Sequence, residues 1–182
     1  MPPKQRITRE MILESAFVMF CQEGMEVVNA RSVAKALNCS TQPIFSYFTG
    51  MQELKDALDA KAKDMYVSSV TSLAKSDNWL VDMCTAHVRF ACENVPVYNH
   101  LFNSTRLDPS RLGAYASLYT DLVANVQEKE GVSREIADKL VDEVGIYANG
   151  LINRLQIKGF GSTDVAKRIA ICYDVVLATL RK

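Results

Sequence analysis

The chain has 182 residues, of which 48% are hydrophobic and 23% are charged, and its 21 basic and 21 acidic side chains cancel. This composition is typical of a globular protein with one or two domains, whereas a neutral chain is unusual for a nucleic-acid binder, so such a role must rest on local charge. No apolar stretch approaches the ~20 residues of a membrane span, and the first residues lack the apolar segment of a signal peptide, so we expect a cytoplasmic protein with no membrane partner.

The first two segments with a helical spacing of apolar residues are bounded by cap residues. Thr8 is suited to cap a first helix that ends near Gly24, and Asn29 is suited to cap a short second helix. Asn38 follows where the chain must turn sharply, and Asn tolerates the left-handed backbone conformation better than most residues. The side chains expected to face inward are Leu13, Ala16, Phe17, Phe20, Val33, Ala34 and Leu37.

Two more helices are predicted over residues 40–73. Ser40 is suited to cap a short third helix, with Pro43 inside its first turn, where the missing N–H costs little. Thr49-Gly50-Met51-Gln52 has the form of a capping box and predicts the start of a long fourth helix. The expected apolar sides hold Ile44, Phe45 and Phe48 in the third helix, and Leu54, Leu58, Ala62, Met65, Ser69 and Leu73 in the fourth.

The rest of the chain predicts five further helices. They are expected over residues 79–95, ended by Pro96, over 97–102, over 108–130, over 133–157, and from Ser162 or Thr163 to the end. Asp108-Pro109 and Ser133 are the start signals of two of them. No strand-like alternation runs far and no repeat is visible, so the expected fold class is all-α with about nine helices.

Two short helices joined by a tight turn within residues 29–48 have the dimensions of a helix-turn-helix. The residues around them are more specific: Phe20-x-x-x-Gly24, Asn29-Ala30-Arg31-Ser32-Val33-Ala34, Leu37-Asn38-Cys39-Ser40, Ile44-Phe45-x-Tyr47-Phe48 and Glu53-Leu54. Over roughly residues 7–60 this pattern resembles the TetR/AcrR family of transcriptional regulators. The resemblance implies a helix-turn-helix DNA-binding domain over residues 1–50 and a ligand-binding and dimerisation domain over residues 51–182.

By the same resemblance, residues 40–48 are the recognition helix, whose exposed side chains would enter the major groove of double-stranded operator DNA. Gln can pair with adenine, Ser and Thr can donate or accept, and Pro or a Thr methyl can touch a thymine methyl. Lys4, Arg6 and Arg9 are expected to form a basic arm near the DNA backbone. The predicted DNA contacts are Arg31, Ser40, Thr41, Gln42, Pro43, Ser46, Tyr47 and Lys55.

The aromatic residues of this segment leave an alternative open. Phe45, Tyr47 and Phe48 could be core side chains of a three-helix bundle; we expect this of Phe45 and Phe48, and a phosphate contact from Tyr47. One departure from the family concerns Met51, because the family usually places Lys just after the recognition helix. Lys55, one turn further along, is expected to compensate.

The C-terminal part shows no catalytic constellation, no metal-ligand spacing and no phosphate loop, so we expect neither an enzyme nor a bound cofactor or metal. Inward-facing tyrosine hydroxyls need partners, which are either neighbouring carbonyl groups or a bound molecule in a mostly apolar pocket. His87 has two interpretations as well: a hydrogen-bonded core residue, which a lone His on an apolar face usually is, or a ligand contact. TetR-like proteins place their effector pocket among these helices, and the candidate contacts are His87, Phe90, Tyr115, Tyr119 and Tyr147.

The last two predicted helices are apolar on more than one side. In the first of them, one stripe holds Ile136, Leu140, Val144, Tyr147 and Leu151, and the other holds Val141, Gly145, Ala148 and Ile152. Gly145 and Ala148 would allow another helix to approach closely. By resemblance, these two helices and their copies in a second subunit form a four-helix homodimer interface.

The function expected from these features is that of a ligand-responsive repressor, in which a small molecule favours a dimer whose recognition helices are wrongly spaced for the operator. A second hypothesis is a helical enzyme or small-molecule carrier whose helix-turn-helix is only structural. A third is a thiol-based redox regulator that uses Cys84 or Cys92. The five cysteines are odd in number and form no Cys-x-x-Cys pair, so we expect reduced, mostly buried thiols.

Overall fold

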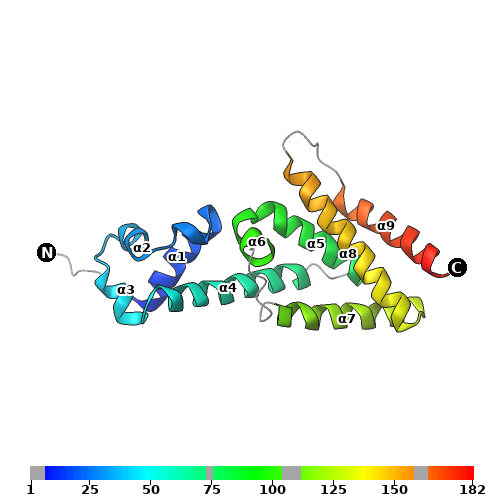
Figure 1. Cartoon of the computed structure of the whole chain (residues 1–182), viewed down its shortest axis with the longest axis horizontal. Helices are drawn as coiled ribbons and strands as arrows, with labels where there is room; N and C mark the ends of the chain where they lie inside the picture. Colours follow the sequence, from blue (N-terminus) through cyan, green and yellow to red (C-terminus); the bar gives the residue numbers. More distant parts are fainter. Residues whose placement is uncertain (1–6, 73–75, 104–111, 158–163) are drawn as a thin grey trace. The chain divides into compact units, whose positions relative to one another are not determined.

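A computed structural model describes residues 7–72, 76–103, 112–157 and 164–182, with side chains in the segment after residue 111 described from Ser117 on. These residues form nine α-helices and one short 3-10 helix and contain no strand, which confirms the predicted all-α class (Figure 1). The elements are α1 (Arg9–Glu23), η1 (Met25–Val27), α2 (Ala30–Ala36), α3 (Gln42–Tyr47), α4 (Met51–Ser72), α5 (Trp79–Glu93), α6 (Val95–Phe102), α7 (Leu112–Glu130), α8 (Arg134–Gln156) and α9 (Val165–Leu180).

The chain divides into two compact units, and α4 belongs to both. The first unit contains residues 1–65 and 94–104, and the second contains residues 66–93 and 105–182. This division describes packing. The expected functional boundary near residue 50, which separates DNA binding from ligand binding and dimerisation, stays a prediction.

In the first unit, α1 packs against α2, α3 and α6. The predicted ends of α1 are confirmed, because the Thr8 side chain accepts from the Met11 N–H and Gly24 ends the helix with a φ of 101°. Its inner face is rotated from the expected one, since Ile12, and not Leu13, joins Ala16 and Phe20 in the core. The other fully buried side chains of this unit are Val28, Val33, Ile44, Phe48, Leu54, Leu58, Ala62 and Val97.

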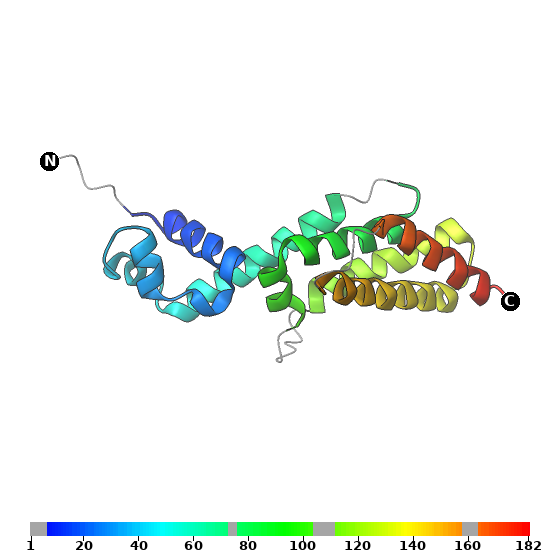
Figure 2. The same ribbon diagram turned by 90° about the horizontal axis from the view of Figure 1, so that it is seen from above.

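In the second unit, α5 packs against α7, α8 and α9, and α8 packs against α7 and α9. Helices α8 and α9 lie side by side in both views (Figure 1 and Figure 2). In the C-terminal part of α4, the inner stripe differs from the predicted one by one position, because Tyr66 and Val70 are buried in place of Met65 and Ser69. In α9 the buried side chains are Ile169, Tyr173 and Leu177.

Both apolar stripes expected on α8 contribute to the core of the unit. In the second stripe, Val141, Ala148 and Ile152 are at most 5% exposed and are covered within the subunit, whereas Gly145 is half-buried. The physical reason is that α8 packs against α5, α7 and α9, which together bury an arc wider than one stripe. The side chain of Ile146, by contrast, is 66% exposed.

Two predicted helix boundaries need correction. Pro96 does not end α5, which stops at Glu93, but lies in the first turn of α6, where proline is well tolerated. The cap of α9 is Asp164, whose side chain accepts from the Lys167 N–H. Ser162, Thr163 and the Asp108-Pro109 start signal lie outside the described residues.

Candidate nucleic-acid interface

The start of α2 is fixed by a closed set of hydrogen bonds around Asn29. The Asn29 side-chain oxygen accepts from the backbone N–H groups of Arg31 at 3.1 Å and Ser32 at 3.0 Å. The Ser32 hydroxyl in turn accepts from the Asn29 N–H at 3.0 Å and donates to the Val27 carbonyl at 2.7 Å. This confirms Asn29 as the cap and sets Arg31, which is exposed, in the first turn of α2.

The turn between α2 and α3 uses a left-handed residue, as predicted. Asn38 has a φ of 51°, and the N–H of the following Cys39 bonds back to the Ala34 carbonyl at 2.9 Å. Helix α3 begins at Gln42 with Thr41 at the N-cap position, so Ser40 does not cap it as expected. Thr41 already has helical backbone angles and makes no side-chain cap bond, while Pro43 lies in the first turn as predicted.

The inner face of α3 is formed by Ile44 and Phe48, each 1% exposed. Phe45 was expected to join them, but its side chain is 51% exposed. The reason is geometric: Ile44 and Phe48 are four residues apart on one side, and Phe45 follows Ile44 by about 100° of rotation. Phe45 is therefore an outward residue of α3 that the sequence interpretation assigned to the core.

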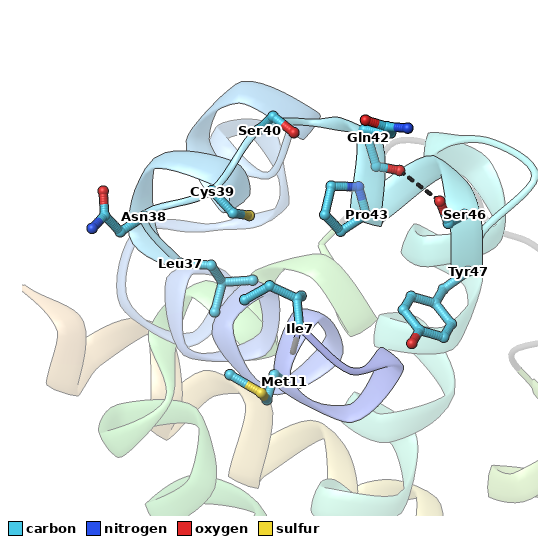
Figure 3. A pocket seen from close by; sticks show the side chains of 10 residues that line it. All are labelled: Ile7, Met11, Leu37, Asn38, Cys39, Ser40, Gln42, Pro43, Ser46 and Tyr47. Carbon is cyan, nitrogen blue, oxygen red and sulfur yellow. Dashed lines mark hydrogen bonds between the residues drawn. The ribbon is translucent and has the colours of Figure 1, made fainter. Parts of the chain in front are cut away.

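A hollow of about 1020 Å³ adjoins the outward face of α3 (Figure 3). Its walls are Ile7, the first turn of α1, the turn between α2 and α3, and α3 itself. Three of the predicted DNA contacts, Arg31, Thr41 and Lys55, do not line the hollow, although both chain neighbours of Thr41 do. The lining residues are Ile7, Met11, Leu37, Asn38, Cys39, Ser40, Gln42, Pro43, Ser46 and Tyr47.

The polar groups of α3 are partly committed to one another. The Ser46 hydroxyl donates to the Gln42 carbonyl at 3.0 Å, as the dashed line in Figure 3 marks, so its hydrogen is engaged within the helix. The Gln42 side chain is exposed, and Tyr47 is 37% exposed. No residue of α3 carries a formal charge.

Positive charge reaches this region from α1, α2 and α4. The Arg9 guanidinium lies 4.7 Å from the centre of the Phe48 ring, which places a predicted arm residue on the folded surface at the start of α1. Met51 is the half-buried first residue of α4, and Lys55 is half-buried one turn later. The start of α4 differs from the predicted capping box. The Thr49 backbone N–H and hydroxyl donate to the Glu53 carboxylate at 2.7 and 2.9 Å, so the partner of Thr49 is Glu53 and not Gln52. These two bonds lower the pKa of the Glu53 carboxyl.

Two of the candidate ligand contacts, His87 and Phe90, both contact Tyr66, a residue that the sequence interpretation missed. The Tyr66 hydroxyl lies 2.9 Å from His87 Nδ1, and the Tyr66 ring packs edge-on against Phe90 with centroids 5.2 Å apart. His87 Nε2 lies 3.3 Å from the Asn149 side-chain oxygen, so Nε2 carries the proton and Nδ1 accepts from Tyr66. Burial lowers the pKa of His87, which the bond to Asn149 opposes.

Tyr119, a residue of α7, contacts α8 at a different place. Its hydroxyl donates to the Asp142 carboxylate at 3.1 Å and to the Asp138 carbonyl at 3.4 Å, and burial with these bonds raises the pKa of Tyr119 to about 12. Asp142 precedes Asn149 by seven residues, or roughly 10 Å along the helix. The structure thus groups His87 with Phe90 but not with Tyr119; Tyr147 is half-buried, and the side chain of Tyr115 lies outside the described residues.

Cys84 and Cys92, the two cysteines considered for redox signalling, both have thiols with a raised pKa. Burial raises the pKa of Cys84 to about 12, and burial likewise raises the pKa values of Cys21, Cys92 and Cys172. A raised pKa suppresses the thiolate, which is the reactive form. Within the described residues, no group of three His, Cys, Asp or Glu side chains is arranged to hold a metal ion, and no helix is long and apolar enough to cross a membrane.

Part of the chain is similar in sequence to a protein named as a helix-turn-helix regulator. The chain is 28% identical over 102 residues to an uncharacterized HTH-type transcriptional regulator of Bacillus subtilis, YobS, and this match covers 54% of the chain and 53% of the relative, so it spans about half of that protein. No family model matches the chain.

Solved structures match nearly the whole chain. A TetR-family transcriptional regulator from Streptomyces coelicolor has a TM-score of 0.61 at 15% identity, with 95% of this chain and 82% of that chain covered. The TetR-family regulator PfmR from Thermus thermophilus has a TM-score of 0.59 at 22% identity, with 92% and 97% covered. The predicted resemblance is confirmed at the level of structure: this chain has the all-α fold of the TetR/AcrR family of transcriptional regulators.

Proposed function

We propose that the protein is a TetR-type transcriptional regulator, a repressor that binds operator DNA as a homodimer through α2 and α3 and is released by a small molecule. The observation that carries the DNA-binding role is the outward face of α3. Gln42, Phe45 and Tyr47 are exposed there, beside a turn held by Asn38 in the left-handed conformation. An α-helix presented in this way fits the major groove of B-DNA.

The proposed affinity for the DNA backbone comes from residues outside α3. Arg31 in the first turn of α2, Lys35 in its last turn and Lys55 in α4 make no ion pair within the described residues, and Arg9 adds a fourth charge. Each phosphate neutralised by such a side chain contributes salt-dependent, sequence-independent affinity. The few charges involved are consistent with the neutral composition of the whole chain.

The dimer is proposed on exposed apolar side chains of α8 and α9. Ile146 is 66% exposed, Ile171 is 54% exposed and Val175 is 60% exposed. Side chains of this size on two neighbouring helices favour contact with a second copy. Ile171→Glu combined with Val175→Glu should therefore yield monomers in sedimentation at micromolar concentration, whereas Val18→Glu, at a residue of α1 with 51% exposure, should leave the dimer intact.

The small-molecule response is proposed for the second unit, where polar groups lie on inward faces of α4, α5 and α7. His87 and Tyr119 are the polar candidates, and Phe90, 2% exposed, is the apolar one. Ligand binding there would favour one spacing of the two recognition helices over another. A ligand found by thermal shift should lose its effect in His87→Ala or Tyr119→Phe.

The DNA-binding role is tested with the full-length chain and a pool of random 30-base-pair duplexes at 50 mM salt. Successive rounds of selection should enrich a two-fold symmetric sequence that the wild-type chain retards. Tyr47→Ala and Arg31→Ala should weaken retardation, whereas Lys139→Ala, which alters an exposed side chain of α8, should not. A failure of the wild-type chain to enrich any sequence would refute the proposal.

A further inference from the structure

The outward face of α3 lacks the side chains that read guanine and cytosine. Arg or Lys paired with guanine is the commonest specific contact in the major groove, and Glu or Asp accept from the cytosine amino group. Helix α3, with the sequence Gln42-Pro43-Ile44-Phe45-Ser46-Tyr47, contains none of these four residue types. Direct readout by α3 must therefore use amide, hydroxyl and apolar groups.

Of the polar groups on α3, the Gln42 amide has the clearest capacity for base readout. It carries both a donor and an acceptor, the pair that matches adenine N7 and the N6 amino group. The Ser46 hydroxyl hydrogen is already donated to the Gln42 carbonyl, which leaves Ser46 only as an acceptor. The ring of Phe45, 51% exposed, has no polar atom and can contact only an apolar feature, which in the major groove is the C5-methyl group of thymine.

We propose that α3 reads A·T base pairs, with the Gln42 amide on an adenine and the Phe45 ring on a thymine methyl group. The inference rests on the proposed function and specifies the DNA partner of that site. Residues 42 and 45 are three apart and lie on the same side of α3, separated by about 4.5 Å along the axis. This distance is close to the rise of DNA per base pair, about 3.4 Å, so the two side chains can reach neighbouring pairs when α3 lies along the major groove.

The apolar contact has a signature that distinguishes it from a backbone contact. Removal of one methyl-sized apolar group from a buried contact corresponds to a factor of about four in affinity. Because no counterion is released, the factor should not change with salt concentration, whereas the contribution of a residue such as Arg31 should fall as salt rises.

The experiment replaces thymine by deoxyuridine, one position at a time, in the duplex selected from the random pool. This exchange removes only the C5-methyl group. We expect about a fourfold loss of affinity when the methyl group is removed at one position of a half-site, and the same loss at its symmetry mate. The size of this loss should be the same at 50 and 200 mM salt. Phe45→Ala should weaken binding of the thymine duplex and abolish the difference between thymine and uracil, while Phe45→Leu, which keeps an apolar side chain, should retain part of it.

A matched control is Val18→Ala, because Val18 on α1 has the same exposure of 51% but lies outside α3 and the hollow. It should leave both the affinity and the uracil effect unchanged. If the selected sequence contains guanine or cytosine at every position that Gln42→Ala relaxes, or if no uracil substitution matters, the inference is overturned while the DNA-binding role stands. If no duplex is enriched, the proposed function and the inference fall together.

Discussion

Substitution of Asn29 tests whether the start of the helix-turn-helix depends on the cap seen in the structure. In Asn29→Ala, the N–H groups of Arg31 and Ser32 lose their acceptor, and the Val27 carbonyl loses the Asn29 amide donor at 3.2 Å but keeps the Ser32 hydroxyl. Loss of a side-chain N-cap costs about 1 kcal/mol, within a range of about 0.5–2. For a chain of this length, about 1 kcal/mol corresponds to roughly 2–4 °C in the melting temperature.

The assay is urea and thermal unfolding followed by circular dichroism, with Asn29→Asp and Asn29→Ser as matched controls. Both keep an oxygen acceptor for the two N–H groups, and Asp adds a favourable charge at the helix start, so both should stay close to wild type. DNA retardation by Asn29→Ala should also weaken, because Arg31 lies in the first turn of α2. An unchanged midpoint in Asn29→Ala, or an equal loss in Asn29→Ser, would refute the assignment of the stabilisation to the cap.

Three further perturbations address other parts of the molecule. Burial lowers the pKa of His87, so protonation of this side chain disfavours the folded state. The stability of the wild-type chain should therefore fall as the pH drops below about 6.5. The urea midpoint, measured from pH 7.5 to 5, should fall less in His87→Gln than in the wild type. Tyr173→Phe removes a hydroxyl that donates to the Glu130 carboxylate at 2.7 Å, and it should lower the free energy of unfolding in urea by about 1.5–3 kcal/mol. The control Lys139→Ala, at an ion pair on the surface of α8, should lower it by less than about 1 kcal/mol. Equal losses would contradict a stabilising role of the Tyr173–Glu130 bond. Met51→Lys should strengthen binding to selected and random duplexes alike and steepen the slope of log K against log salt by ~0.9; an unchanged slope would mean that residue 51 does not face a phosphate.

Several features that the sequence predicts correctly are determined within three or four residues. Thr8, Asn29 and Ser133 cap their helices as expected, and Asn38 adopts the left-handed turn. For the three caps, the acceptor oxygen and the N–H groups that it serves are close in sequence, so the signal is complete in one short segment.

Burial was harder to predict, because it depends on neighbours that are distant in sequence. Phe45 and Phe48 are both aromatic and come from the same short segment, yet only Phe48 reaches the core and receives the Arg9 guanidinium on its ring. In α9 apolar residues occur all round, so periodicity alone could not select Tyr173 over Cys172 as the buried position. The bond from Tyr173 to Glu130, 43 positions away, belongs to the fold of the second unit and leaves no local signal.

The same long-range partners limit what an effector of the proposed regulator can be. Tyr119 already donates to Asp138 and Asp142, and His87 already bonds to Tyr66 and Asn149. A wholly apolar molecule that displaced either set and covered these half-buried side chains would leave polar groups without partners, at a cost of about 1–3 kcal/mol for each group. An effector that binds there gains affinity only if it replaces the lost bonds, with an acceptor for the His87 Nε2–H or the Tyr119 hydroxyl. The chemistry of these two side chains therefore favours an amphipathic effector, with an apolar body against Phe90 and a polar acceptor group, over a pure hydrocarbon.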